Sequence, residues 1–199
     1  MNAKNESETQ PLVIVLAAGS GTRFRASGGD VHKLDAPLSG MRVRDHVMAC
    51  VRASQLPWHV VEREDVAHIA QQGMGWSIAA GVAATPGAAG WLILPADLPL
   101  VRPETLQAVA RALREHEVVI PFYRGQRGHP VGFGRTCREA LLALQGDEGA
   151  RSIVQAGQAM RLDVDDAGCV MDVDTRDALE RAQEMLDLRR TGVPYFRSP

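Results

Sequence analysis

Residues 13–33 read VIVLAAGSGTRFRASGGDVHK, an apolar run that passes into a glycine-containing loop and then into a segment carrying cations. The run Pro11–Ala17 is continuously apolar and rich in β-branched residues, which predicts a buried strand of a parallel sheet. Gly19 and Gly21 let the backbone approach a ligand because they carry no Cβ. Such a loop after a buried strand exposes backbone N–H groups, so it predicts a phosphate-binding site.

Lys33 stands out in the composition. The chain contains two lysines, Lys4 and Lys33, against twenty arginines. A lysine in a chain that otherwise uses arginine indicates a need for a compact ammonium rather than a planar guanidinium. A glycine loop followed by Arg23 and Lys33 therefore predicts a site for a nucleoside triphosphate.

The loop departs from two common nucleotide-binding motifs. It lacks the GxxxxGK[ST] pattern of a Walker A loop, and Phe24 stands where a dinucleotide-binding GxGxxG fingerprint has its third glycine. A dehydrogenase is for that reason the less favoured alternative. A glycine turn that only connects a strand to a helix is the other alternative.

The bulk composition limits the class of protein. A chain of 199 residues with 45% hydrophobic and 23% charged residues predicts one domain with a proper core. The net charge of −2 provides no general attraction to nucleic acid or to anionic membranes. No apolar run approaches the ~20 residues of a membrane helix, and MNAKNESETQ at residues 1–10 lacks a signal-peptide core. We expect a cytoplasmic protein with a disordered leader at 1–10, a domain at 11–190 and a tail at 191–199.

The three cysteines and six histidines show no metal-ligand spacing. Cys50, Cys137 and Cys169 are expected to be buried thiols.

Apolar strands alternate with amphipathic helices along the chain. The expected strands are 11–17, 59–61, 90–94, 118–121, 130–134, 160–165 and 169–173. The expected helices are 42–53, 64–72, 77–84, 103–116, 135–144, 149–156 and 175–190, with Gly75 in a turn before the third. This alternation predicts a single α/β domain whose mainly parallel, mixed sheet carries helices on both faces. Ligands of such sheets bind beyond the carboxyl ends of the strands.

Carboxylates follow two of the expected strands. Asp97 lies in the stiff loop Pro95–Pro99 after strand 90–94, and one or two such carboxylates together with substrate phosphates suit Mg²⁺. Asp97 is equally well interpreted as a turn or capping residue. Asp172 and Asp174 are two positions apart in a segment expected to be extended, so they could face the same side and point together into a site. The alternative is that Asp174 or Thr175 caps the last helix.

Three further side chains are candidates for substrate contact. Ser77 begins an expected helix, whose N-terminus could bind an anion or a base edge, although it could equally be an ordinary cap. His129 lies in a polar loop that enters a strand, and Arg151 follows a turn between helices. Each of these two could reach an anionic substrate or serve only the structure.

Taken together, these segments resemble the MobA-like nucleotidyltransferases, and most closely their molybdenum cofactor cytidylyltransferase branch. The motifs that carry the resemblance are LAAGSGTRF at 16–24, HKL at 32–34, GMGWSIAAGV at 73–82, LPADLPLV at 94–101, GHPVGFG at 128–134, GDEGAR at 146–151 and DVDT at 172–175. The resemblance covers about residues 12–186, and the seven motifs follow one another in this order.

The resemblance implies a Rossmann-like fold and a role for each matching residue. Arg23 and Lys33 match positions that hold the phosphates, Asp97 matches the residue that binds Mg²⁺ at the α-phosphate, and Ser77 lies near the base or ribose. Asp172 and Asp174 match a second acidic position. The nucleotide-binding residues are then Leu16, Ala17, Ala18, Gly19, Gly21, Thr22 and Ser77. Ala18, in LAAG rather than LAGG, favours CTP over GTP.

The chain departs from the family pattern in the middle. About forty residues separate Leu34 from Gly73, where family members have an additional strand and helix. Asp35 stands where an apolar residue is usual. We therefore expect a shortened middle in which one sheet strand is missing or degraded.

The resemblance implies transfer of CMP from CTP to the terminal phosphate of a molybdopterin cofactor, with release of pyrophosphate. The expected partners are CTP, the molybdopterin cofactor, and a molybdoenzyme or its accessory chaperone, with no nucleic acid and no membrane. One alternative is nucleotide transfer to another phosphorylated metabolite, such as a sugar phosphate or phospholactate. Another is a non-catalytic carrier of the molybdenum cofactor.

Overall fold

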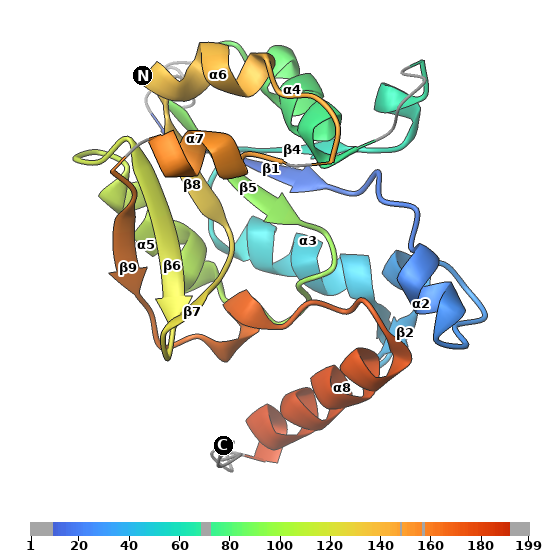
Figure 1. The fold of residues 1–199 in the computed structure, drawn as a ribbon. Coiled ribbons are helices and arrows are strands. Elements are labelled where there is room, and N and C mark those ends of the chain that lie inside the picture. The colour runs from blue at the N-terminus through green and yellow to red at the C-terminus, as the bar shows by residue number, and fades with distance from the viewer. Residues whose placement is uncertain (1–9, 69–72, 148, 157, 192–199) are drawn as a thin grey trace.

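The structure, a computed structural model, describes residues 10–68, 73–147, 149–156 and 158–191. A seven-stranded sheet forms its centre (Figure 1), in the order β4-β1-β5-β8-β6-β7 with β9 also paired to β6. Its strands are β1 (Leu12–Leu16), β4 (Trp58–Val61), β5 (Gly90–Pro95), β6 (Val118–Tyr123), β7 (Gln126–Arg127), β8 (Val131–Gly134) and β9 (Met160–Asp163). A small hairpin is formed by β2 (Pro37–Leu38) and β3 (Met41–Arg42).

Most of the helices lie between these strands in sequence, and η4 and α8 follow the last strand. The α-helices are α2 (Thr22–Ala26), α3 (Val43–Ala53), α4 (Met74–Ala84), α5 (Pro103–Ala112), α6 (Arg138–Leu142), α7 (Arg151–Ala156) and α8 (Arg176–Thr191). Four 3-10 helices are η1 (Lys33–Asp35), η2 (Glu64–Val66), η3 (Arg135–Cys137) and η4 (Ala167–Val170).

The sheet is mixed and mainly parallel, as predicted. Strand β1 pairs in parallel with β4 and β5, and β9 pairs in parallel with β6. Because β8 is antiparallel to both β5 and β6, strand β6 runs in the same direction as β5. Strands β4, β1, β5, β6 and β9 therefore share one direction, and their carboxyl ends meet at one edge of the sheet.

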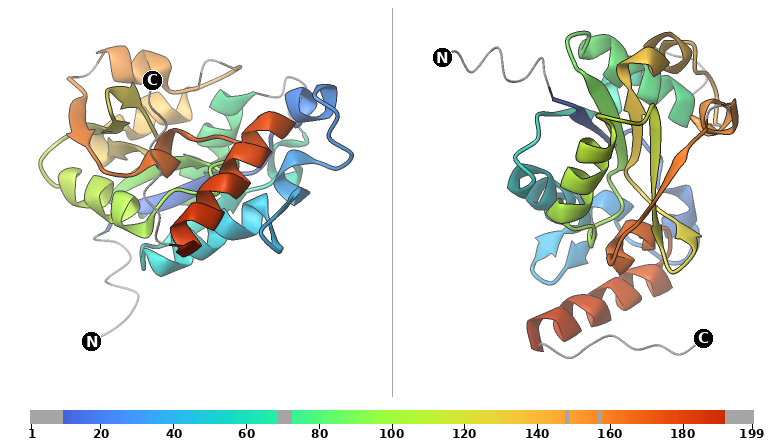
Figure 2. Two further views of the ribbon diagram at one scale, coloured as in Figure 1. Left: turned by 90° about the horizontal axis from the view of Figure 1, so that it is seen from below. Right: turned by 90° about the vertical axis from the view of Figure 1, so that its left-hand side faces the viewer.

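Helices cover both faces of this sheet, which confirms the predicted layers (Figures 1 and 2). Val13 and Val15 of β1 join an apolar cluster that includes residues of α3, α5 and α8. Ile14, between them, joins a second cluster with residues of α4, α6 and α7. Alternate residues of a strand point to opposite faces, so a continuously apolar strand is required where both faces are covered.

The segment between Leu34 and Gly73 supplies the β2–β3 hairpin, α3 and β4. Strand β4 pairs with β1 and lies at the edge of the sheet. Asp35 belongs to η1, and its Oδ1 lies 3.5 Å from the guanidinium of Arg42. This aspartate, which stands where an apolar residue is usual, therefore forms a surface ion pair. The segment thus provides one sheet strand and one covering helix.

Helix α4 begins at Met74, three residues earlier than expected, and includes Gly75. The predicted turn at Gly75 is wrong. The N–H of Gly75 donates to the carbonyl oxygen of Gly146 at 2.8 Å, and a Cβ on Gly75 would lie 2.5 Å from the carbonyl oxygen of Gln145. A glycine is therefore used here for close packing within a helix.

Other differences concern the ends of elements. Helix α5 stops at Ala112, and the expected helix 135–144 is divided into η3 and α6. The expected strand 169–173 is wrong, because η4 occupies its first half. Of the expected helix 64–72, the structure describes η2, and 69–72 lie outside the described residues.

The three cysteines are buried free thiols, as predicted. Residues 1–9 of the expected leader and 192–199 of the expected tail lie outside the described residues, while Thr191 ends α8. Within the described ranges, no helix is both long enough and apolar enough to cross a membrane.

Candidate active site

The glycine loop leaves the carboxyl end of β1 and passes over the edge of the sheet. The N–H of Ala96 donates to the carbonyl oxygen of Leu16 at 3.1 Å, and the N–H of Ala17 donates to that of Val61 at 2.9 Å. Gly21 has φ +65°, in the left-handed region, and caps the start of α2. Glycine adopts this conformation without strain, which turns the chain sharply into α2.

His32 holds this loop against η1. Its Nδ1 accepts from the N–H of Leu34 at 3.3 Å, so its Nε2 carries the proton and donates to the carbonyl oxygen of Gly19 at 2.9 Å. The Arg63 guanidinium donates to the same oxygen at 3.3 Å. These bonds fix the loop relative to Lys33, the residue that follows His32. Although the HKL motif drew attention to Lys33, it did not reveal this role of His32.

Lys33 joins two carboxylates from distant parts of the chain. Its Nζ donates to Oδ2 of Asp97 at 2.5 Å and to Oδ1 of Asp174 at 2.6 Å. Arg23 forms an ion pair with the other oxygen of Asp174. The side chains of Lys33 and Asp97 are 13% and 15% exposed, so solvent screens this pair weakly. Four predicted site residues thus form one network.

Burial and charge act against each other in this network. Burial alone would lower the pKa of Lys33, but the charge of Asp97 and hydrogen bonds to Asp174 and Asp97 outweigh it and raise the pKa. Burial alone would raise the pKa of Asp174, but the hydrogen bond and charge of Lys33, together with Arg23, lower it. Both groups are therefore charged at neutral pH.

Asp172 lies beside this network and lines the same cavity. Its pKa is raised by burial and then by the negative charges of Asp97 and Asp174. The N–H of Val173, between Asp172 and Asp174, donates to the carbonyl oxygen of Asp97 at 2.8 Å. This bond holds the segment against the loop after β5. Asp172 and Asp174 line one cavity, as predicted, although they lie in a loop and not in a strand.

The acidic side chains of the site do not form a complete set of metal ligands by themselves. Within the described ranges, no group of three His, Cys, Asp or Glu side chains is placed to hold one ion. Asp97, Asp172 and Asp174 are therefore not assembled as a three-ligand centre, and Lys33 contacts two of them. However, Oδ1 of Asp97 is buried and has no hydrogen-bond partner among the described residues. An unpartnered carboxylate oxygen beside a second carboxylate suits Mg²⁺, which takes one or two carboxylates and phosphate oxygens.

Two cavities meet at Lys33 and Asp97. The first, of about 480 Å³, extends under Leu16, Ala18 and Ser77 toward α4, and is here named the loop cavity. The second, of about 470 Å³, extends toward His129 and Asp172, and is named the carboxylate cavity. Both are lined by Gly19, Ser20, Thr22, Arg23, Lys33, Met74, Pro95 and Asp97. Gly21 lines the carboxylate cavity, whereas Ala17 is buried in the core beneath the loop.

Ser77 lines the loop cavity but does not begin a helix. It lies in the second turn of α4, is buried, and its hydroxyl donates to the carbonyl oxygen of Gly73 at 3.4 Å. The predicted helix N-terminus at Ser77 is therefore wrong, and Ser77 lines the same cavity as Gly19 and Thr22 of the loop.

His129 lies where the ladder between β6 and the following strands is interrupted. Strands β7 and β8 both pair with β6, and the N–H of Gly128 still donates to the carbonyl oxygen of Pro121 in β6 at 2.8 Å, but His129 does not pair with β6. The N–H of His129 instead donates to the carbonyl oxygen of Cys169 at 2.8 Å. Burial lowers the pKa of His129 although Asp97 counteracts it, so the imidazole is neutral at neutral pH. It lines the carboxylate cavity together with Lys33 and Asp97.

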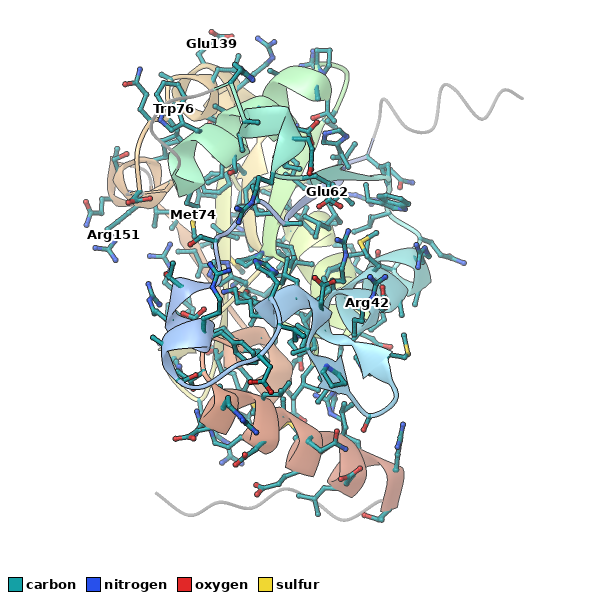
Figure 3. The ribbon with its side chains drawn as sticks, turned by 90° about the vertical axis from the view of Figure 1, so that its right-hand side faces the viewer. Arg42, Glu62, Met74, Trp76, Glu139 and Arg151 are labelled. Carbon is teal, nitrogen blue, oxygen red and sulfur yellow. The ribbon has the colours of Figure 1, made fainter. Side chains whose placement is uncertain are left out.

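Arg151 is not part of the Lys33 network. It begins α7 and lines a third cavity of about 250 Å³, together with His129 and Met74. Figure 3 shows Arg151 at the outer side of α7, with Met74 nearer the centre of the molecule. The structure thus brings Arg23, Lys33, Asp97, Asp172, Asp174 and His129 together and leaves Arg151 at a separate cavity.

Several residues that line the cavities were not predicted, and three of them carry long or charged side chains. Met74 is 46% exposed and lines all three cavities. Arg127 lines the carboxylate cavity and the third cavity. Asp147 lines the loop cavity, and its Oδ1 lies 2.9 Å from the point that a Cβ added to Gly73 would occupy. The GMG and GDEGAR motifs contain Met74 and Asp147, but spacing alone did not distinguish them from their neighbours.

The Gly168→Ala substitution is expected to lower the free energy of unfolding by about 3 kcal/mol, the upper part of the range for overpacking. Its Cβ would lie 1.9 Å from the carbonyl oxygen of Leu100, and the backbone on both sides would have to move. Asp166 also fixes this turn, since it accepts from the N–H groups of Gly168 and Arg102. Urea unfolding measures the effect. Gly19→Ala, with open space at its Cβ, is the control, and equal stability of the two variants would contradict the expectation.

Comparison with known proteins places this geometry in a family. The chain matches the MobA-like NTP transferase domain over residues 13–162. The purine catabolism protein PucB of Bacillus subtilis (strain 168) is 28% identical over 202 residues, which cover 87% of this chain and 96% of PucB. The bifunctional protein GlmU of Xanthomonas oryzae pv. oryzae (strain MAFF 311018) is 32% identical over 150 residues, which cover 66% of this chain and 32% of GlmU.

A solved structure supports the same assignment. Rv0371c from Mycobacterium tuberculosis H37Rv superposes with a TM-score of 0.70 at 26% identity, covering 88% of this chain and 99% of Rv0371c. A second structure of Rv0371c is a complex with manganese. The match to the family covers most of the chain and includes the glycine loop, Lys33 and Asp97. This chain belongs to the family of MobA-like NTP transferase domains.

Proposed function

We propose that the protein transfers CMP from CTP to the terminal phosphate of a molybdopterin cofactor and releases pyrophosphate. The observation that carries the proposal is the convergence of Lys33, Asp97, Asp174 and Arg23 beside the glycine loop. This network lies where the loop cavity and the carboxylate cavity meet. A nucleotide in one cavity and an acceptor in the other would have their reacting phosphates at the network. The product would pass to a molybdoenzyme or its accessory chaperone.

The reaction makes modest demands on proton transfer. An oxygen of the acceptor phosphate bonds to the α-phosphorus of CTP, and the bond from that phosphorus to the bridging oxygen of pyrophosphate breaks. The attacking phosphate is already ionised, so no strong general base is required. The difficulty is to bring an anion up to a polyanion, which is a matter of positioning and charge neutralisation. Lys33 and Arg23 supply the positive charge, and the N–H groups of the glycine loop orient the phosphates.

Asp97, with Asp172 or Asp174, would hold a divalent cation, which we propose to be Mg²⁺. Bound there, the cation would offset negative charge at the α-phosphate. The buried, unpartnered Oδ1 of Asp97 supports this assignment. Lys33 contacts both Asp97 and Asp174 in the free protein. On nucleotide binding, its ammonium would be released from at least one carboxylate and could then bind phosphate oxygens.

Two residues of the loop cavity support CTP as the nucleotide. Ala18 belongs to the LAAG form of the loop, which the family resemblance associates with CTP. Asp147 presents a carboxylate near Gly73, and a carboxylate accepts hydrogen bonds. Cytosine carries an exocyclic amino group that can donate to it, whereas uracil carries a carbonyl there. Asp147 therefore favours CTP over UTP.

A thermal-shift screen of nucleotides with Mg²⁺ tests the proposal. A ligand at 100 times its dissociation constant stabilises the folded state by ~2.7 kcal/mol. We expect CTP to raise Tm more than GTP, UTP or ATP. A preference for GTP would contradict the argument from Ala18, and a preference for UTP would contradict that from Asp147. Calorimetry that shows no binding of any Mg-nucleotide would instead favour a non-catalytic carrier. Pyrophosphate release with several acceptors then identifies the acceptor.

A further inference from the structure

Lys33 places a positive charge between two carboxylates that come from different parts of the chain. Its Nζ lies 2.5 Å from Oδ2 of Asp97, after β5, and 2.6 Å from Oδ1 of Asp174, before α8. Arg23 contacts Oδ2 of Asp174. Three of the four oxygens of these two carboxylates therefore contact a cation that belongs to the chain itself. The fourth, Oδ1 of Asp97, has no partner among the described residues.

A divalent cation and this ammonium compete for the same carboxylates. Mg²⁺ binds oxygen ligands at about 2.0–2.1 Å, so an ion held by both Asp97 and Asp174 would lie between them, where Nζ already lies. An ion held by Asp97 and Asp172 instead would be separated from Nζ only by the carboxylate of Asp97. Like charges at such distances repel strongly where solvent screens them weakly. The metal can therefore bind tightly only after Nζ has moved away.

Lys33 has space to move toward the glycine loop. It lines both the carboxylate cavity and the loop cavity. Its Cγ lies 3.5 Å from the point that a Cβ added to Gly21 would occupy, so its stem passes beside the loop. A lysine stem is flexible, and a triphosphate bound at the loop would offer Nζ phosphate oxygens in place of the carboxylates. Without a triphosphate, the same movement would leave partly buried charges unpaired, which is unfavourable.

We propose that the ammonium of Lys33 excludes divalent metal from Asp97 and Asp174 until a nucleoside triphosphate draws it to the glycine loop. Metal and nucleotide then bind as a coupled pair, and each raises the affinity of the protein for the other. This inference rests on the proposed function, because it takes the loop as the triphosphate site and Asp97 as a ligand of the metal. It adds that the protein without nucleotide binds the metal weakly.

Binding of Mn²⁺ without nucleotide tests the proposal, with the electron paramagnetic resonance signal of free Mn²⁺ as the readout. The Lys33→Met variant keeps an unbranched stem and loses the ammonium, which leaves the carboxylates open to the metal. We expect it to bind Mn²⁺ at least tenfold more tightly than the wild type. Lys33→Gln is a second variant, in case the methionine prevents folding. Equal affinities of the wild type and a folded Lys33 variant would overturn the proposal, as would a wild type that binds Mn²⁺ as tightly without nucleotide as with it.

Arg23→Met is the matched control, because it removes the same formal charge from the same network. The Arg23 side chain is 79% exposed, and Nζ of Lys33 would still lie between the carboxylates. We expect its Mn²⁺ affinity to rise less than threefold. An equal gain in Arg23→Met and Lys33→Met would show that net charge alone excludes the metal, and would overturn the proposal.

The double variant Lys33→Met/Asp97→Asn identifies the site of the gained ion. We expect it to lose most of the gain in Mn²⁺ affinity, because the amide that replaces Asp97 is a much weaker ligand. A gain that persists in the double variant would place the ion elsewhere and would overturn the proposal.

Titration of a non-hydrolysable α,β-methylene analogue of CTP separates this inference from the proposed function. Its affinity for the wild type should rise at least tenfold when Mg²⁺ is added, and equal affinity with and without Mg²⁺ would contradict the coupling. If the analogue binds neither with nor without Mg²⁺, the proposed function fails. The Mn²⁺ affinities measured without nucleotide still decide whether Lys33 excludes the metal.

Discussion

The Asp97→Asn variant is expected to lose CMP transfer by a factor of about 10²–10³ and to keep its fold, and Asp97→Ala should lose at least as much. Asparagine has the shape of aspartate but no charge. It therefore weakens the contact with Lys33 Nζ, which is 2.5 Å from Oδ2 in the wild type, and leaves only a neutral amide oxygen for the cation that we assign to Oδ1. Pyrophosphate release at saturating CTP and Mg²⁺ measures the loss.

Asp163→Asn is the matched control for this experiment. Asp163 pairs with Arg161 on the surface, its side chain is 69% exposed, and exposed pairs of this kind contribute little to stability. Its rate should equal that of the wild type, and circular dichroism should show that both variants are folded. Near-normal turnover of Asp97→Asn would remove Asp97 from the catalytic assignment.

The fold was predictable from the sequence because local patterns carry it. The apolar run around Val13 and Ile14 can be covered on both faces only in a central strand, and it lies between β4 and β5. The antiparallel strand β8 is harder to predict. It has the same apolar character as a parallel strand, and its direction follows from pairing with β5 and β6.

The errors arise where distant packing overrides local preference. Gly75 has the local character of a turn, but it lies inside α4 because the backbone of Gln145 packs against it. The segment after Asp166 looks like a strand, but Gly168 fits against Leu100 and the chain turns into η4. Neither contact can be derived from residue spacing, because each partner lies far away in sequence.

The site was predictable in its residues but not in its pairing. Composition drew attention to Lys33, and position after a strand drew attention to Asp97 and Asp174. These carboxylates lie 64 and 141 residues from Lys33 in sequence, and no local pattern shows that one ammonium contacts both. Met74 and Arg127 were not predicted as site residues. A single methionine, exposed in the structure, and one of twenty arginines do not differ from their neighbours in any sequence pattern.

The Lys33→Ala variant is expected to lose CMP transfer by a factor of about 10²–10³, and Lys33→Arg should not restore it. Nζ lies 2.5 and 2.6 Å from two carboxylate oxygens that belong to different segments, a geometry that suits a compact ammonium. A guanidinium is planar and larger, so it would displace Asp97 or Asp174. Pyrophosphate release measures the rates. Recovery of most of the activity in Lys33→Arg would show that any cation suffices.

The same variant should also change how stability depends on pH. Removing the cation from partly buried carboxylates is expected to lower the free energy of unfolding by about 1–3 kcal/mol at pH 7. The lowered pKa of Asp174 stabilises the wild type above the ordinary aspartate range, and that contribution is lost as pH falls through the folded-state pKa. The raised pKa of Lys33 stabilises the wild type fully below the ordinary lysine range, and this contribution is lost as pH rises through the folded-state pKa.

The difference in the free energy of unfolding between the wild type and Lys33→Ala should therefore shrink below about pH 4 and above about pH 10. Arg138→Ala, which removes a surface partner of Glu139, should show no such window in urea unfolding. A difference that is independent of pH would indicate that Lys33 stabilises the fold by packing and not by its charge.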